Sequence, residues 1–150
     1  MPVIRSCPQC GKSNRVPARH LADEGRCGSC RGALPPMAEP LEPEPAVFDE
    51  VVREAAVPVL IDFWAAWCGP CRAVAPEVEK AAASLAGRAV VVKVDTEKHP
   101  ELAGRYGVQA IPNFVVLRDG HVVLQRPGFA PQAQIEDWIR AASARAPGRP

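Results

Sequence analysis

The sequence lacks the features that would assign it to several common classes of protein. No apolar stretch approaches the roughly 20 residues of a membrane-spanning helix, and residues 1–7 lack the apolar core of a signal peptide. No charge sign is in excess, because 18 Lys and Arg residues face 17 Asp and Glu residues. We therefore expect a cytoplasmic monomer without a membrane contact, and the charge balance does not call for a nucleic acid partner.

The six cysteines are the main chemical feature that is present. In a reducing cytoplasm structural disulfides are rare, so these cysteines indicate metal binding or catalysis. All six occur in C-x-x-C pairs, of which two lie within residues 1–34 and the third lies near the middle of the chain. The two kinds of chemistry are therefore expected in two different parts of the sequence.

The two N-terminal pairs predict a metal site. A spacing of 16 residues between them fits the C-x2-C-x15–20-C-x2-C pattern of a structural zinc site. Four thiolates complete a closed tetrahedral shell, and a module of this size needs a metal to fold. We expect one zinc ion per chain; iron in the same shell, or two further redox-active pairs, are the alternatives. His20, between the pairs, is expected at the surface. The predicted ligands are Cys7, Cys10, Cys27 and Cys30.

Residues 35–46 form a predicted linker, because they contain five prolines and three glutamates. Such a composition favours an extended, fairly stiff spacer with no core of its own. We therefore divide the chain into a zinc ribbon (1–34), this linker (35–46) and a catalytic domain (47–150), with a disordered tail at 146–150. Little packing is expected between the ribbon and the catalytic domain. The ribbon's small basic excess is too weak to indicate nucleic acid binding.

The third cysteine pair lies where a strand is followed by a helix. Residues 57–64 are apolar and predict a buried strand, while residues 72–85 predict a helix, which Pro76 either kinks or ends. Cys68 and Cys71 then lie one turn apart at the start of that helix, where the helix dipole favours a thiolate. We expect Cys68 to be the more exposed nucleophile and Cys71 to be the buried resolving thiol.

The segment Ile61–Cys71, which ends in Trp-Cys-Gly-Pro-Cys, resembles the active-site segment of the thioredoxin family. The resemblance extends over about residues 46–145. It implies an α/β thioredoxin fold, with a mixed sheet covered by helices on both faces. It also implies a protein-disulfide reductase without an organic cofactor, which acts on disulfide-containing proteins and is itself reduced by an NADPH-dependent thioredoxin reductase. With its N-terminal ribbon, the chain resembles the zinc-containing bacterial thioredoxins.

Asp62 is out of place in an apolar strand, and burial of its carboxylate raises its pKa. We expect it to accept a proton from Cys71, as the resemblance also implies; the alternative is an aspartate that reaches solvent at the strand end. The resemblance places Lys93 near Asp62 and makes Ile111–Pro112 a cis-proline loop opposite the cysteines. It further implies an apolar substrate groove made of Trp67, Gly69, Pro70, Ile111, Pro112 and Gly128. Asn113 and Pro127 depart from the family pattern and bear on substrate preference.

The remaining elements are expected from local patterns. The apolar pair at 47–48 predicts a short first strand, followed by a helix over 50–55. Residues 89–94 are rich in β-branched side chains and predict a central strand, and a helix is expected near 101–106. Asp119-Gly120, between two apolar runs, predicts a hairpin of residues 113–117 and 121–125. A helix over 133–144 closes the domain, with Trp138 packed on its apolar face.

Two other functions remain open from the sequence alone. The ribbon could recruit a protein or a nucleic acid, with the catalytic domain serving as a chaperone-like surface. Alternatively, oxidation of the four N-terminal cysteines could expel the metal and change the activity, so that the ribbon acts as a redox switch.

Overall fold

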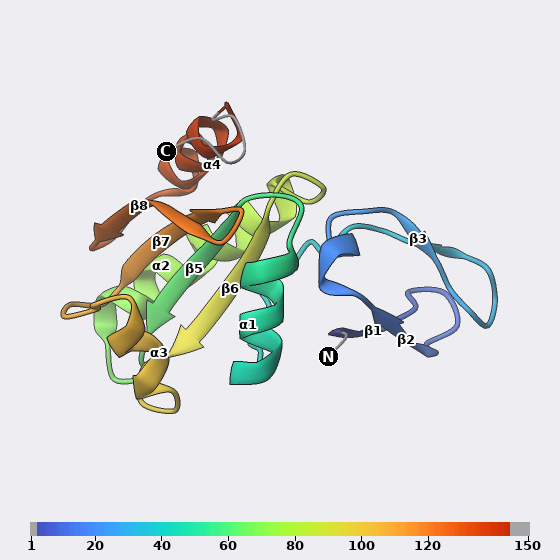
Figure 1. Cartoon of the computed structure of the whole chain (residues 1–150), viewed down its shortest axis with the longest axis horizontal. Helices are drawn as coiled ribbons and strands as arrows, with labels where there is room; N and C mark the ends of the chain where they lie inside the picture. Colours follow the sequence, from blue (N-terminus) through green and yellow to red (C-terminus); the bar gives the residue numbers. More distant parts are fainter. Residues whose placement is uncertain (1–2, 145–150) are drawn as a thin grey trace.

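The computed structural model describes residues 3–144. A four-stranded sheet forms its centre, in the order β6-β5-β7-β8 (Figure 1). The strands are β5 (Val59–Trp64), β6 (Val90–Asp95), β7 (Asn113–Arg118) and β8 (His121–Pro127). β5 pairs parallel with β6 and antiparallel with β7, so the sheet is mixed. The expected tail at 146–150 lies outside the described residues.

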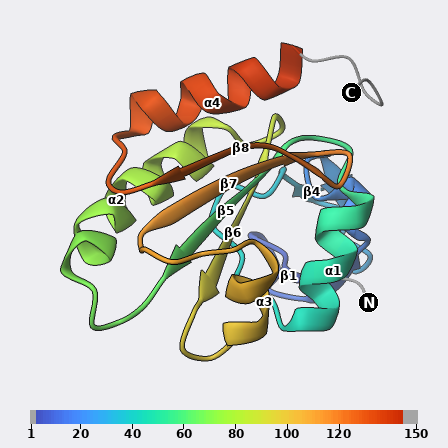
Figure 2. The ribbon, with the colours of Figure 1, turned by 60° about the vertical axis from the view of Figure 1, so that its left-hand side comes forward.

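Helices cover both faces of this sheet, as expected (Figure 2). One face carries α2 (Gly69–Ser84) and α4 (Gln132–Ala144), while the other carries α1 (Pro45–Glu54) and α3 (Pro100–Arg105). Successive side chains of a strand point to opposite faces, so β5 contributes to two cores. Ile61 and Phe63 pack with α1 and α3, whereas Leu60 packs with α2 and α4. Pro76 lies inside α2, so the alternative that the helix ends before it is wrong.

The β7–β8 hairpin confirms the Asp-Gly prediction. Asp119 and Gly120 both have positive φ, at 52° and 78°, as the tight turn between two twisted strands requires. Trp138 packs its ring 5.7 Å from that of Phe114 in β7, as predicted for the closing helix. Within residues 3–144, no helix is both long and apolar enough to cross a membrane.

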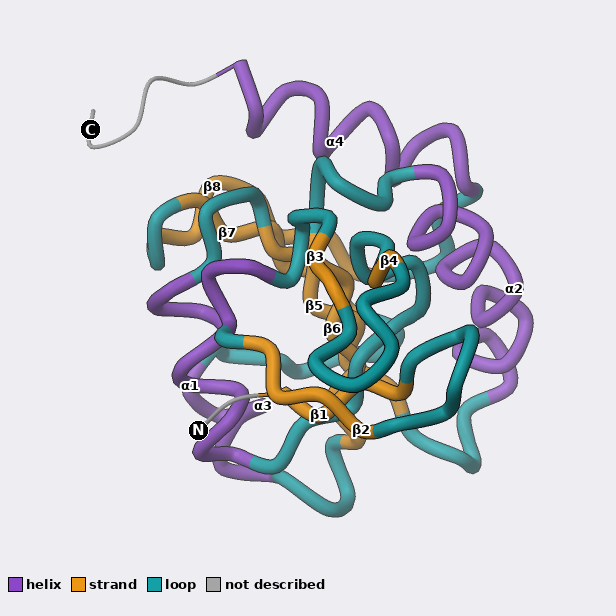
Figure 3. Tube along the Cα trace, turned by 90° about the vertical axis from the view of Figure 1, so that its right-hand side faces the viewer, coloured by secondary structure: helices purple, strands orange, loops and turns teal. Residues whose placement is uncertain are grey.

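The N-terminal module consists of two small antiparallel hairpins (Figure 3). β1 (Val3–Ser6) pairs with β2 (Ser13–Val16), and β3 (Gly25–Arg26) pairs with β4 (Ala33–Leu34). A single 3-10 turn, η1 (Ala18–His20), connects the two hairpins.

Two element predictions are wrong. The predicted strand at 47–48 is part of α1, which begins at Pro45 inside the predicted linker. Phe48 and Val51 are its buried residues, and their spacing of three is helical. The second error concerns residues 89–94, because β6 is an edge strand of the sheet rather than a central one. Its β-branched residues are buried nevertheless, because they pack into the cores on both faces of the sheet, and the linker residue Leu41 bridges to Val92 along the edge.

The ribbon packs against the catalytic domain, contrary to expectation. Val3, Leu21 and Met37 belong to the same buried core as residues of α1. Leu21 has no exposed surface, and the N–H of Met37 donates to its carbonyl oxygen at 2.9 Å. Figure 1 shows the ribbon beside α1. The proline-rich linker therefore fastens the two modules together instead of holding them apart.

Candidate active site and zinc site

The third cysteine pair lies at the N-terminus of α2, as predicted. Cys68 is the N-cap residue, and its Sγ accepts the N–H of Cys71 at 3.2 Å. The two side chains form a disulfide whose Cα atoms are 5.2 Å apart. Cys68 is 3% exposed and Cys71 is 4% exposed, so the expected difference in exposure is absent from this oxidised form. An N–H donor at a helix N-terminus is suited to stabilise a thiolate at Cys68 after reduction.

The loop that precedes β7 faces this disulfide. Its Ile111–Pro112 peptide bond is cis, as the family resemblance implies. The carbonyl oxygen of Ile111 lies 3.8 Å from the Sγ of Cys68. Gly128, just after β8, donates its N–H to the carbonyl of Pro112 at 2.7 Å. Three separate parts of the chain thus meet beside Cys68, and they include the expected groove residues.

Two exposed aromatic residues lie close in sequence to the residues of the expected groove, one that the sequence suggested and one that it did not. Trp67 is 66% exposed, and its Nε1 donates to Glu97 at 2.8 Å, which fixes the ring beside Cys68. Gly69 and Pro70 are also exposed. Phe129, which follows Gly128, is 55% exposed and was missed, because a single phenylalanine in a loop carries no sequence pattern.

Asn113 has a structural role that is visible in its contacts. It is 6% exposed, and its Nδ2 donates to the carbonyl of Ala110 at 3.2 Å. Its Oδ1 accepts from Gln125 at 3.1 Å, and the same Gln125 amide group donates to the carbonyl of Tyr106. Asn113 therefore ties the cis-proline loop to β8 and does not face the groove as a free polar group. Pro127 lies opposite it in the β7–β8 ladder.

Asp62 is buried in the middle of β5 with 1% of its surface exposed. Its Oδ1 has no hydrogen-bond partner among the described residues. Because Asp62 alternates with Ile61 and Phe63, it lies on the face of the sheet that α2 covers. Burial raises the pKa of Asp62 to about 7, Lys93 opposes this rise, and Glu42 adds to it. The alternative of an aspartate that reaches solvent is therefore wrong.

Lys93 lies directly opposite Asp62 in the parallel β5–β6 ladder. Its Nζ is 4.7 Å from the centre of the Trp64 ring, a distance at which a cation and an aromatic face attract each other. Lys93 is partly buried, so its charge acts on the Asp62 carboxyl, whose pKa it lowers, with reduced screening by solvent.

The four N-terminal cysteines converge on one point. Their sulfur atoms all lie within 4.8 Å of one another. The Cys7–Cys30 and Cys10–Cys27 sulfur distances are both 3.6 Å. A tetrahedron with Zn–S bonds of about 2.3 Å has edges of about 3.8 Å, so the arrangement fits a zinc ion. His20 is outside this cluster and pairs with Asp23 at 2.7 Å on the surface, as predicted.

Backbone donors favour the thiolate at the first cysteine of each pair, whereas the pKa of Cys30 is raised to about 11, because the donor from Gly32 is outweighed by its contacts with Cys10 and Cys7. The N–H groups of Cys10 and Gln9 lower the pKa of Cys7, and those of Cys30 and Ser29 lower the pKa of Cys27 to about 6. This is the donor pattern that a metal-binding knuckle requires, because the bound form of each cysteine is the thiolate.

Asn14 links the two knuckles and was not anticipated from the sequence. Its Oδ1 accepts the N–H of Gly28 at 2.9 Å, while its Nδ2 donates to the carbonyl of Lys12 at 3.0 Å. The same Nδ2 lies 3.6 Å from the Sγ of Cys27. The side chain therefore holds a ligand of the second pair in place relative to the first.

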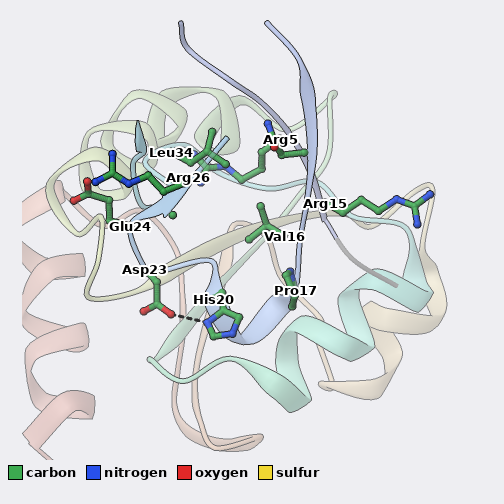
Figure 4. Close-up of a pocket in the computed structure, with 11 residues that line it drawn as sticks. Arg5, Arg15, Val16, Pro17, His20, Asp23, Glu24, Arg26 and Leu34 are labelled. Carbon is green, nitrogen blue, oxygen red and sulfur yellow. Dashed lines mark hydrogen bonds and ion pairs between the residues drawn. The ribbon is translucent and has the colours of Figure 1, made fainter. Parts of the chain in front are cut away.

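The ribbon also contains a cavity of about 290 Å³ away from the cysteines (Figure 4). Arg5, Arg15 and Arg26 line it together with the carboxylates of Asp23 and Glu24. Its walls thus carry both signs of charge, and one guanidinium NH group of Arg5 already donates to the carbonyl of Pro35 at 2.7 Å.

Comparisons with known proteins identify a family for each of the two modules. The family described as Thioredoxin matches residues 39–141, and the one described as Thioredoxin 2, N-terminal, matches residues 6–32. Thioredoxin C-3 of Corynebacterium nephridii is 36% identical over 137 residues, which cover 91% of this chain and 93% of that protein. Thioredoxin of Haemophilus influenzae is 35% identical over 103 residues, covering 69% of this chain and 96% of that protein.

A solved structure of a mutant thioredoxin from Halobacterium salinarum NRC-1 superposes with a TM-score of 0.66 at 33% identity. The match covers 73% of this chain and 96% of that one. The fold and the sequence relationships both indicate the same family. The chain therefore belongs to the thioredoxin family of disulfide oxidoreductases, in the branch that carries an N-terminal zinc ribbon.

Proposed function

We propose that this protein is a cytosolic protein-disulfide reductase that acts by dithiol–disulfide exchange. The observation that carries the proposal is the arrangement around Cys68: its sulfur caps α2, bonds to Cys71 and lies 3.8 Å from the Ile111 carbonyl oxygen of the cis-proline loop. A disulfide at this place is reachable by an extended substrate segment that pairs with Ile111, strand to strand.

The first step is attack by the Cys68 thiolate on a substrate disulfide. A bond forms between Cys68 Sγ and one substrate sulfur, the substrate S–S bond breaks, and the other substrate sulfur leaves as a thiolate. The N–H of Cys71 supports this step because it donates to the attacking sulfur. Trp67, Gly69, Pro70, Ile111, Pro112 and Gly128 provide the apolar surface on which the substrate segment lies.

The second step resolves the mixed disulfide. Cys71 loses its proton and attacks Cys68 Sγ, so the Cys68–Cys71 bond forms and the substrate leaves with a second thiolate. Asp62 accepts the proton of Cys71, because its pKa of about 7 lets it take up a proton at neutral pH. Lys93 opposes the rise in the pKa of Asp62, so a fraction of Asp62 is ionised at neutral pH and can take up the proton. The substrate gains two electrons and the cysteine pair loses two.

The oxidised pair then requires an external reductant. A thioredoxin reductase that draws on NADPH returns two electrons to Cys68 and Cys71, and disulfide-bonded proteins are the substrates. The ribbon holds one zinc ion through Cys7, Cys10, Cys27 and Cys30 and takes no direct part in the exchange. The bound zinc supplies folding stability to the module that carries it.

Trapping of the intermediate tests this proposal. Cys71→Ser removes the resolving thiol, so a disulfide-bonded protein such as insulin should remain attached to Cys68 until dithiothreitol releases it. Cys68→Ser keeps the neighbouring thiol and serves as the matched control, which should trap nothing. Equal trapping by both variants, or by neither, would refute the assignment of nucleophile and resolving cysteine.

A further inference from the structure

The linker forms an additional edge to the sheet beside the proton acceptor. The N–H of Leu41 donates to the carbonyl of Val91 at 2.8 Å, and the N–H of Lys93 donates to the carbonyl of Leu41 at 2.8 Å. These two bonds fix residues 41–42 alongside β6 in a parallel bridge to Val92. The backbone of Glu42 is therefore held next to Lys93, although its side chain is exposed.

Strand alternation decides which way Glu42 points. Leu41 and its partner Val92 both pack into the core on the α1 side of the sheet. The next residue, Glu42, therefore extends to the opposite side, as Lys93 and Asp62 do. Asp62 is paired with Lys93 in the ladder. Three residues from adjacent strands thus form one row on the same face, in which Lys93 lies between the two acidic residues in strand order.

A cavity of about 120 Å³ adjoins this row. Glu42 and Lys93 both line it, together with the ring of Trp64, against which the Lys93 ammonium group rests at 4.7 Å. The Nε1 of Trp64 is buried and has no hydrogen-bond partner among the described residues. Lys93 thus shares this cavity with Glu42 and its strand register with Asp62, and it is the one cationic residue paired with Asp62 in the ladder.

We propose that Glu42 is a positioning residue for the exchange reaction, which competes with Asp62 for the ammonium group of Lys93 and so keeps the Asp62 carboxyl able to take up the proton of Cys71. This inference rests on the proposed role of Asp62. Without Glu42, Lys93 would serve Asp62 alone and hold it ionised. Asp62 would then be a weaker proton acceptor, since a more stable carboxylate binds a proton less tightly.

Other charged groups line the same cavity, but Glu42 is the one among them, besides Lys93, that shifts the pKa of Asp62. The remaining titratable residues that line the cavity are Glu44, Asp95, Lys98 and His99. Asp95 accepts the N–H groups of Glu97 and Lys98, which occupies its carboxylate locally. Lys93 and Glu42 are the two charges that shift the pKa of Asp62, in opposite directions. Among the residues that α2 buries, Cys71 is the one that carries a titratable group in the reduced form.

The test replaces Glu42 in the full zinc-loaded chain. Glu42→Gln removes one charge with little change of shape, and Glu42→Lys reverses it. Glu44→Gln is the matched control, because Glu44 belongs to the same linker and lines the same cavity. The titration of the Asp62 carboxyl carbon is followed by NMR in the oxidised protein, where no thiol titrates. The pH dependence of mixed-disulfide resolution is measured in parallel by rapid mixing.

The Asp62 midpoint is expected to fall by about half a pH unit in Glu42→Gln, and by about twice as much in Glu42→Lys. The resolution rate should reach its plateau at a correspondingly lower pH, and Glu44→Gln should match the parent protein. An unchanged midpoint in both Glu42 variants, or an equal shift in Glu44→Gln, would overturn the inference. Asp62→Asn separates the two proposals: an unchanged resolution profile in that variant would refute the role of Asp62, whereas the NMR titration tests Glu42 independently of activity.

Discussion

The buried carboxylate of Asp62 should make the protein less stable at high pH, and Asp62→Asn should remove this effect. The side chain is 1% exposed, and burial raises its pKa from 3.8 to about 7. The folded protein therefore holds the Asp62 proton more tightly than the unfolded chain does. Stability from this group is fully present below pH 3.8, and it is lost as the pH rises through 7.

The magnitude follows from the two pKa values. Ionisation of Asp62 lowers the free energy of unfolding by about 2 kcal/mol at pH 5.5 and by about 4 kcal/mol at pH 8.5. The asparagine side chain does not titrate, so any constant cost of its buried amide is the same at every pH. The stability of Asp62→Asn minus that of the parent should therefore increase by about 2 kcal/mol between pH 5.5 and pH 8.5.

Urea unfolding of the oxidised, zinc-loaded proteins at several pH values measures this difference. All other titrating groups, including the zinc ligands, are common to both proteins and cancel in the subtraction. Asp119→Asn, in the exposed turn of the β7–β8 hairpin, is the control and should show no such trend. A difference between parent and Asp62→Asn that stays constant with pH would refute the claim that Asp62 is buried and charged above neutral pH.

Two further predictions concern the ribbon. Leu21→Ala should lower the free energy of unfolding of the whole protein by about 2–5 kcal/mol, because Leu21 is fully buried in the core shared with α1. Fluorescence of the three tryptophans, which all lie outside the ribbon, should report the loss, while exposed Ile4→Ala should not; an unchanged tryptophan transition would mean that the ribbon unfolds by itself. Asn14→Ala should weaken zinc binding about 10- to 100-fold in competition with a chelator, because it frees the second knuckle. Ser13→Ala is its neighbour control, and equal affinities of the two variants would contradict this role.

The sequence predicted those parts of the structure that depend on local spacing. The Asp119-Gly120 turn, the helix that starts at Cys68 and the fourfold cysteine cluster each follow from a short pattern with a definite geometry. Asp62 could be found because a carboxylate in an apolar strand has no structural reason to be there. The resemblance to thioredoxins added the cis-proline loop, which spacing alone does not predict.

The parts that sequence reasoning missed depend on contacts between distant residues. Met37 and Leu41 lie in a proline-rich stretch that reads as a spacer, yet Met37 packs into the common core and Leu41 bonds to both Val91 and Lys93 in β6. A single apolar residue gives no periodic pattern, so docking of the ribbon could not be recognised. The apolar pair at 47–48 is too short to distinguish a strand from a helix, and only the burial of both Phe48 and Val51 shows the helical spacing. Asn14 and Glu42 act through neighbours that only the fold brings together.

The central claim is that the six cysteines divide between one zinc site and one exchange site. The mass of the freshly purified protein under native conditions tests this claim most directly. Under reductant, the account predicts one zinc ion per chain. Mild oxidation should then form a single disulfide, between Cys68 and Cys71, so the mass falls by the two thiol hydrogens and the zinc is retained. A protein that holds no zinc and forms three disulfides under the same oxidation would contradict the account.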